Sequence, residues 1–253
     1  MDVIKNRVES GSRWLKAELH AHCSLDPVDH RLCSHNAEEL ISAAASLRYD
    51  VLAITCHDLD VWSQELEEFA ENLGIALIPG MEVNVEGRYH TLLYNFRTGS
   101  ENLNAFEEVR GQSREDTLVV APHPYFPARY CLGNQLEKNI DLFDAIEVSG
   151  FYLSNLDFNE RARRVARKYR KTMVGNGDVH LLWQLGKTFT WIYSEPSVAE
   201  ILAAVKKGAV RIESNSLAFS QTAAWWATAA WRTVFPANPA PSSKIGAPLP
   251  DSP

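Results

Sequence analysis

The chain has 253 residues, a hydrophobic fraction of 45% and a formal net charge of -7, values that fit one large α/β barrel or two small domains. The acidic balance disfavours tight binding to nucleic acid, because such binding needs a basic surface. The four cysteines contain no Cys-x-x-Cys pair, and no segment has the pattern of a signal peptide or a membrane span, so we expect a cytoplasmic protein without a four-cysteine zinc site and without a membrane partner.

Short apolar segments alternate with amphipathic segments along most of the chain. An apolar run at 14–19 predicts the first strand, and Asn36 with Glu39 predicts a capping box at the start of the first helix. Further strands are expected at 50–55, 75–81, 89–96, 118–121, 145–148, 173–175, 189–193 and 210–212. Helices are expected at 62–73, 102–111, 134–142 and 157–171, and after Ser197. This alternation is typical of parallel βα units, and about seven units predict a closed, barrel-like sheet. An open doubly wound sheet is the alternative.

The same pattern divides the chain into four parts. Residues 1–13 lead into a barrel domain, which we expect to span 14–215. Residues 216–235 are expected to form a helix that carries Trp225, Trp226 and Trp231. This helix either packs on the barrel, the reading we prefer, or forms the interface of a homo-oligomer. Residues 236–253 are rich in proline and serine and are predicted to be disordered.

Histidine and acidic residues recur where the predicted strands end. The first two histidines stand at i and i+2, so they project to the same side of one strand end. The carboxyl ends of parallel strands meet at one end of a barrel, and we therefore expect these side chains to converge on one pocket. The set comprises His20, His22, His57, Glu82, His123, Asp178 and His180.

This set of side chains predicts a metal-dependent hydrolase. Imidazole and carboxylate ligands suit Zn, Mn or Fe(II) better than Cu(I) or Mg. Because the set exceeds the needs of one ion, we expect two or three divalent ions, with Glu82 able to bridge them. Such clusters polarise a phosphoryl oxygen and activate a water molecule. The predicted reaction is hydrolysis of a phosphate ester, with a small phosphomonoester or a nucleotide as substrate.

Five short motifs follow one another along the chain: His20-x-His22, Thr55-Cys56-His57-Asp58, Gly80-Met81-Glu82, Pro122-His123-Pro124 and Gly177-Asp178-Val179-His180. In this order they resemble the motifs of the PHP (polymerase and histidinol phosphatase) family. The resemblance covers roughly residues 14–215. It implies a distorted (βα)7 TIM-like barrel, a di- or trinuclear metal site at the C-terminal ends of the strands, and metal-dependent phosphoesterase activity. It makes the seven residues metal ligands and adds His90; we expect His57, Asp178 and His180 to take part in catalysis as well.

Several residues keep two interpretations at this stage. The family has an acidic ligand shortly after the first histidine pair, and Asp26 is preferred here over Asp29 because it is nearer to that pair. His90 is either a ligand or a strand histidine bonded to backbone. Arg129 either binds the substrate phosphate or forms a surface ion pair. Glu147 either orients a ligand histidine or pairs with an arginine.

Two other functions are alternatives. The same metal centre could hydrolyse a C–N bond, as amidohydrolase barrels do. The chain could also be a non-catalytic accessory or binding module, although such a protein would be expected to have lost some motif residues, and none of the seven is missing here.

Overall fold

A computed structural model describes residues 11–96, 103–153, 157–218, 221–223, 225 and 227. The strands are β1 (Arg13–Glu18), β2 (Val51–Ile54), β3 (Ala76–Val85), β4 (Tyr89–Tyr94), β5 (Leu118–Ala121), β6 (Ala145–Ser149), β7 (Thr172–Asn176), β8 (Thr188–Ser194) and β9 (Val210–Ser214). The helices are α1 (Ala37–Ser46), α2 (Gln64–Asn72), α3 (Phe106–Gln112), α4 (Asn134–Lys138), α5 (Asn159–Tyr169), α6 (Val198–Lys206) and the short 3₁₀ helix η2 (Leu182–Gln184). Within these residues the strands form one sheet in the order β7-β6-β5-β4-β3-β2-β1-β8-β9.

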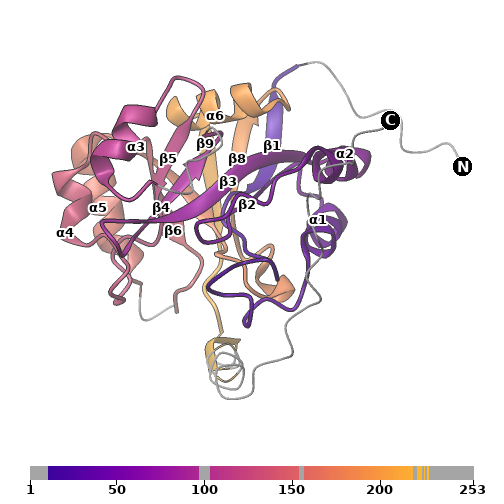
Figure 1. Cartoon of the computed structure of the whole chain (residues 1–253), viewed down its shortest axis with the longest axis horizontal. Helices are drawn as coiled ribbons and strands as arrows, with labels where there is room; N and C mark the ends of the chain where they lie inside the picture. The colour runs from indigo at the N-terminus through magenta and orange to yellow at the C-terminus, as the bar shows by residue number, and fades with distance from the viewer. Residues whose placement is uncertain are drawn as a thin grey trace, which may run out of the picture.

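The sheet curves into a nearly closed barrel (Figure 1). The Thr190 hydroxyl on β8 joins the two ends of the sheet, because it accepts a hydrogen bond from the Gly175 N–H of β7 (2.8 Å) and donates one to the Gly175 carbonyl (2.9 Å). A Cβ atom at Gly175 would lie 2.4 Å from Cγ2 of Ile212 on β9. Only glycine therefore allows these strands to approach so closely, and the predicted barrel-like α/β fold is confirmed.

The exact repeat of seven βα units is not confirmed. Strands β1, β2 and β3 are parallel, and so are β5, β6 and β7, but β4 and β8 run antiparallel to their neighbours. Strand β3 continues to Val85 instead of ending near Met81, and residues 86–88 turn the chain directly into β4. Because this hairpin replaces one βα unit, Glu82 lies within a strand and not after one.

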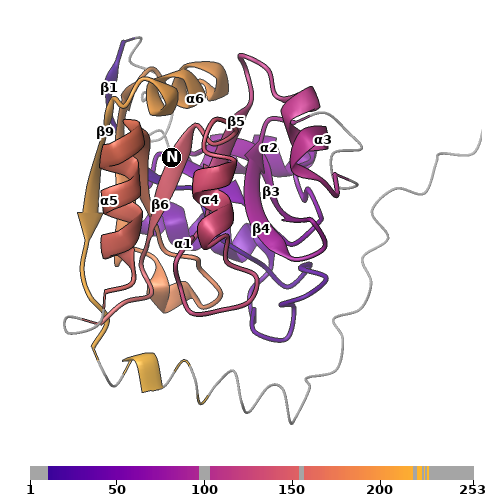
Figure 2. The ribbon, with the colours of Figure 1, turned by 90° about the vertical axis from the view of Figure 1, so that its left-hand side faces the viewer.

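The helices cover the outside of the barrel and one of its ends. Helices α1 and α2 pack beside β2 and β3, whereas α3, α4 and α5 cover the side formed by β4, β5 and β6 (Figures 1 and 2). Leu202 and Val205 of α6 join the apolar cluster inside the barrel, which includes Leu15 and Leu92. Helix α6 therefore fills the end from which β1 starts, and the opposite end remains open for a site.

Local sequence signals set several helix boundaries. The Asn36 side chain accepts a hydrogen bond from the Glu39 N–H (2.7 Å), and the Glu39 carboxylate accepts one from the Asn36 N–H (2.9 Å), which confirms the predicted capping box. Helix α4 ends at Lys138, earlier than the predicted end near residue 142, and Asn139 is its C-cap.

Parts of the sequence predictions fall beyond the structure. None of the helices in the described ranges has the length and apolar character needed to cross a bilayer. The predicted tail and most of the predicted C-terminal helix, including Trp226 and Trp231, lie outside the described residues.

Candidate metal centre

Glu82 lies at the centre of a buried histidine cluster at the open end of the barrel. Its Oε2 atom lies 3.3 Å from Nε2 of His20 and 3.5 Å from Nε2 of His22. The same oxygen lies 3.3 Å from Nε2 of His57. Three imidazoles from two strand ends therefore face one carboxylate oxygen.

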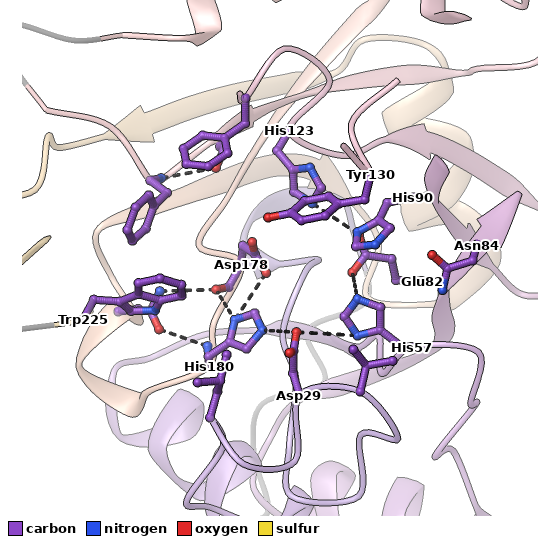
Figure 3. A pocket seen from close by; sticks show the side chains of 16 residues that line it. Asp29, His57, Glu82, Asn84, His90, His123, Tyr130, Asp178, His180 and Trp225 are labelled. Atoms are coloured by element: carbon purple, nitrogen blue, oxygen red, sulfur yellow. Dashed lines mark hydrogen bonds and ion pairs between the residues drawn. The ribbon is translucent and has the colours of Figure 1, made fainter. Parts of the chain in front are cut away.

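The second oxygen of Glu82 faces two further histidines. Its Oε1 atom lies 2.7 Å from Nδ1 of His90 on β4 and 3.3 Å from Nε2 of His123, which follows β5. Figure 3 shows His57, His90 and Glu82 close together on one side of the pocket. The two Glu82 oxygens thus separate the histidines into two groups, the arrangement expected of a carboxylate that bridges two cations.

Asp178 supplies a second carboxylate to the first group. Its Oδ1 atom lies 3.4 Å from Nε2 of His20 and 3.3 Å from Nε2 of His22. His180, two residues later, stacks on His22 with ring centroids 4.4 Å apart. The structure thus brings all seven sequence-predicted ligands, together with His90, into one cluster.

The two candidate aspartates of the loop after β1 differ in what they contact. Asp26 is 1% exposed and accepts hydrogen bonds from the backbone N–H of His57 and of two loop residues, while its oxygens lie 2.8 Å from Nδ1 of His22 and 3.0 Å from Nδ1 of His57. Asp29 faces the pocket, and its Oδ2 lies 3.0 Å from Nε2 of His180. Asp26 is therefore saturated with hydrogen bonds, whereas Asp29 is open to the cavity.

Glu147 contacts and orients His20, one of the clustered histidines. It is fully buried; one oxygen lies 2.9 Å from Nδ1 of His20 and accepts a hydrogen bond from the Asn176 amide, and the other accepts the His123 N–H. When His20 donates from Nδ1, its Nε2 lone pair faces Glu82, as a metal-binding imidazole requires. The structure thus decides between the two interpretations of Glu147 in favour of an orienting role.

Backbone bridges fix the motifs relative to one another. The N–H of His22 donates to the carbonyl of Val179, and the N–H of Val179 donates to the carbonyl of His20 (2.8 and 3.1 Å). An equivalent bridge links His57 with Glu82. Since the first motif is tied to the last and the second to the third, the side chains are positioned by sheet geometry that extends beyond the named strands.

Two of the clustered residues have unusual backbone conformations. His123 and Asp178 have φ values of 25° and 48°, which lie in a region that residues other than glycine seldom occupy. Such conformations cost on the order of 1–3 kcal/mol each and concentrate at functional sites. The fold therefore tolerates local strain to direct these two side chains toward the cluster.

Burial and mutual attraction set the charges of the cluster. Burial opposes the charge of the His20 imidazolium, but the nearby carboxylates, Asp178 first, outweigh it and raise the pKa of His20 well above its usual value. Burial likewise opposes ionisation of Glu82, yet the histidines, His90 first, hold the pKa of Glu82 well below its usual range. The carboxylates are thus held ionised, the state in which they bind a cation.

Known proteins share this fold and part of this sequence. Residues 157–210 match a family model described as PHP-associated. A two-domain protein of Bacteroides vulgatus that contains a predicted PHP-like metal-dependent phosphoesterase has a similar structure, with a TM-score of 0.60 and 20% identity over 86% of this chain and 70% of that chain. The chain is therefore similar to PHP proteins in residues 157–210 and in its fold.

The other proteins to which this chain is similar are more diverse. An uncharacterized protein of Methanocaldococcus jannaschii is 25% identical over 166 residues, which are 61% of this chain and 95% of that protein. PsfC of Pseudomonas syringae has a TM-score of 0.58 and 19% identity over 88% of this chain and 99% of that chain. A lesion-specific endonuclease of Pyrococcus furiosus has a TM-score of 0.57 and 16% identity over 79% of this chain and 58% of that chain. At these identities the structural likeness shows the PHP fold and leaves the substrate open.

Unsatisfied polar atoms indicate that the histidine cluster fits metal ions. In the described part of the chain, His22 Nε2, Glu82 Oε1 and His90 Nδ1 are buried and have no hydrogen-bond partner. Glu82 Oε1 and His90 Nδ1 are 2.7 Å apart, but their geometry does not suit a hydrogen bond. An unsatisfied buried polar atom costs roughly 1–3 kcal/mol, and a cation shared between such atoms would remove that cost. Five triplets of these residues have ligand atoms within 4.8 Å of one another, so the donors fit more than one divalent ion.

A cavity of about 250 Å³ opens beside this cluster. Asp29, Asp178 and His180 line it together with histidines of the second motif and of β4. None of the described lining residues is a lysine or an arginine. Arg129 is exposed and is not among them, so the structure does not bring this predicted phosphate ligand to the site.

Sequence reasoning missed several residues of the site. Tyr130 stacks on His90 with ring centroids 4.3 Å apart, and the Gln184 side chain accepts a hydrogen bond from the His180 N–H. Cys131 Sγ lies 3.4 Å from Nδ1 of His123. These residues lie in loops and a short helix, where no periodic pattern marks them.

Glu18 was also missed, although the sequence contains a signal for it. This acidic residue stands between the apolar residues Ala17 and Leu19 at the end of β1 and is fully buried, and it accepts hydrogen bonds from the N–H groups of His20 and Gly177. Burial raises the pKa of Glu18 to about 8, against the effect of these two donors. Glu18 therefore joins the loops of the first and last motifs beneath the cluster.

Proposed function

We propose that this protein is a PHP-type hydrolase of phosphate esters that uses two or three divalent metal ions, Zn, Mn or Fe. The observation that carries the proposal is the position of Glu82, whose two oxygens lie between five histidine nitrogens at 2.7–3.5 Å. A carboxylate whose two oxygens face different histidines is the kind of ligand that bridges the ions of a multinuclear centre. A small phosphomonoester or a nucleotide is the proposed substrate.

The proposed ligand groups follow from the geometry. One group comprises His20, His22 and Asp178 with one Glu82 oxygen, and a second comprises His90 and His123 with the other. We further propose that Asp29 and not Asp26 supplies the acidic ligand of the first loop, beside His57 and His180, because the Asp26 oxygens are occupied by hydrogen bonds.

The described cavity lining contains no lysine or arginine, so we assign the binding of the phosphate charge mainly to the metal ions. When bound, such ions polarise the phosphoryl oxygen and lower the pKa of a water molecule. Asp178 and His180 line the cavity, and we assign them the transfer of the proton from the attacking water to the leaving oxygen. Glu147 keeps His20 in the tautomer that directs Nε2 to the cluster.

The test is an assay of purified protein on an aryl phosphate and on nucleoside monophosphates, with Mn or Zn, before and after chelation. We expect hydrolysis that is lost on chelation and restored by metal. Glu82→Gln should lower kcat at least 100-fold, because it weakens both ligand groups, whereas Glu137→Gln on the surface should leave kcat unchanged. Activity that persists without metal, or cleavage of amides but not of phosphates, would contradict the proposal.

A further inference from the structure

One wall of the cavity beside the metal ligands is aromatic. Phe126, Phe151 and Trp225 line it, and Val28 and Leu32 add apolar surface. These residues come from four separate parts of the chain: the loop after β1, the segment after β5, the segment after β6, and the described residues beyond β9. The cavity at the open end of the barrel is therefore lined by ionisable side chains on one side and by apolar side chains on another.

The aromatic rings of this wall hold one another in place. The rings of Phe126 and Phe151 have centroids 5.8 Å apart at an interplanar angle of 76°. Those of Phe151 and Trp225 are 4.9 Å apart at 62°. Contacts of this edge-to-face type contribute about 0.5–1.5 kcal/mol beyond area burial, so the wall is organised before any ligand arrives. Each of the three side chains keeps part of its surface accessible.

One small molecule can contact both the ionisable and the aromatic residues that line the cavity. The cavity of about 250 Å³ exceeds the roughly 150 Å³ that accommodates benzene in an apolar protein cavity. Figure 3 shows Trp225 and Tyr130 on two sides of the labelled ligand side chains, and Tyr130 already stacks on His90. A ring against the wall would thus place an attached phosphate next to Asp178 and His180.

We propose that this aromatic wall is a stacking subsite, and that the substrate is a phosphomonoester whose alcohol part carries a planar aromatic ring. The inference rests on the proposed phosphoesterase function and narrows its substrate class. Aromatic side chains bind planar rings through their faces, a mode that tolerates different ring types. The ring can come from an aryl alcohol or from a nucleoside base, which share this chemistry.

Paired compounds isolate the contribution of the ring. Benzyl phosphate and cyclohexylmethyl phosphate have similar size and similar leaving alcohols but differ in planarity and aromaticity. Adenosine 5′-monophosphate and ribose 5-phosphate differ only in the base. We expect kcat/KM for the ring-bearing member to be about tenfold higher, since stacking on one aromatic side chain changes affinity by roughly that factor. A preference in the first pair alone indicates an aryl ester, and one in the second pair alone indicates a nucleotide.

Variants locate the preference on the wall. Trp225→Leu and Phe151→Leu should each reduce the preference, measured as the ratio of kcat/KM within a pair, at least threefold. Trp62→Leu is the matched control, because Trp62 is a half-exposed tryptophan that does not line this cavity. Equal kcat/KM values within both pairs, or a preference unaffected by both wall variants, would overturn the subsite.

Binding separates failure of the subsite from failure of the proposed function. Calorimetry on the Mn-loaded protein compares benzylphosphonate with cyclohexylmethylphosphonate, which are not hydrolysed. If no phosphate ester is cleaved, the proposed function fails, and a tenfold lower Kd for the benzyl compound that is lost in Trp225→Leu still supports the subsite. Equal Kd values in that case reject the subsite as well.

Discussion

Asp26 and Asp29 lie in the same loop but differ in how their carboxylates are hydrogen-bonded. Asp26 is nearer to the first histidine pair, which favoured it as a ligand, but backbone N–H groups and two imidazoles occupy its carboxylate. Asp29 contacts His180 and faces the cavity. The sequence could place an acidic residue in this loop, but the N–H and the imidazole of His57, which complete the hydrogen bonds of Asp26, come from a different strand end and could not be predicted.

The two aspartates should therefore differ in the effect of substitution. Asp26→Asn should lower the free energy of unfolding of the metal-free protein by about 2–3 kcal/mol, because hydrogen bonds to a charged acceptor contribute roughly 1.5–3 kcal/mol each. Asp29→Asn should change it by less than about 1 kcal/mol, as expected near the surface, and should lower kcat at least tenfold. Urea unfolding in chelator and the phosphatase assay measure both effects. A fully active Asp29→Asn variant would rule out Asp29 as a ligand.

Glu147 provides a second prediction for a single residue. Glu147→Gln keeps the shape of a buried side chain but removes the charge that orients His20. We expect metal affinity to fall about 10–100-fold, the usual effect of losing a partner behind a metal ligand. Competition with a chelating dye measures this affinity. The surface substitution Glu137→Gln should have no effect, and an unchanged affinity in Glu147→Gln would show that Glu147 only fills space.

Among the elements, strands that end at a histidine motif were predictable, whereas β3 was not. Apolar runs stop just before His20 and His57, so the sequence located these residues at strand ends. The third strand was predicted to end at Met81, but Val83 and Val85 continue the alternation and β3 extends to Val85. The hairpin to β4 that results depends on pairing between the two strands, which periodicity alone does not show.

The closure of the barrel depends on contacts between strands that are far apart in the sequence. The hydroxyl of Thr190 bonds Gly175 on the other side of the gap, and no local pattern predicts this pair. Gly175 is also the position at which a side chain would meet Ile212 at 2.4 Å. The need for glycine there follows only from the assembled barrel.

Gly175→Ala should accordingly destabilise the protein. Overpacking of this kind costs about 1–3 kcal/mol, and for a domain of this size each kcal/mol lowers Tm by roughly 2–4 °C. Gly111→Ala is the matched control, because no atom lies within 4 Å of its added Cβ and Gly111 lies in α3; there alanine should stabilise by roughly 0.5–1 kcal/mol. Scanning calorimetry compares the two. Equal Tm values would mean that the gap between β7 and β9 can widen freely.

At the scale of the whole molecule, the cluster exists only when the barrel is assembled. Its side chains come from the ends of β1, β2, β5 and β7 and from within β3 and β4, and its sequence span runs from His20 to His180. The sequence predicted this convergence because the carboxyl ends of strands in a barrel share one end. A metal ion that joins such distant segments binds the folded chain and not the unfolded one, so metal binding and folding are coupled.

Removing metal should therefore lower the thermal stability of the whole protein. An ion present at about 100 times its Kd stabilises the folded state by about 2.7 kcal/mol, which corresponds to a Tm shift of roughly 5–10 °C for a domain of this size. Calorimetry with Mn or Zn, after chelation and after return of the metal, measures the shift. Glu82→Gln should show less than half of it, because Glu82 contacts both histidine groups, whereas Glu137→Gln should retain all of it. A Tm that is the same in chelator and in metal would indicate that the cluster does not bind these ions, and it would remove the basis of the proposed reaction.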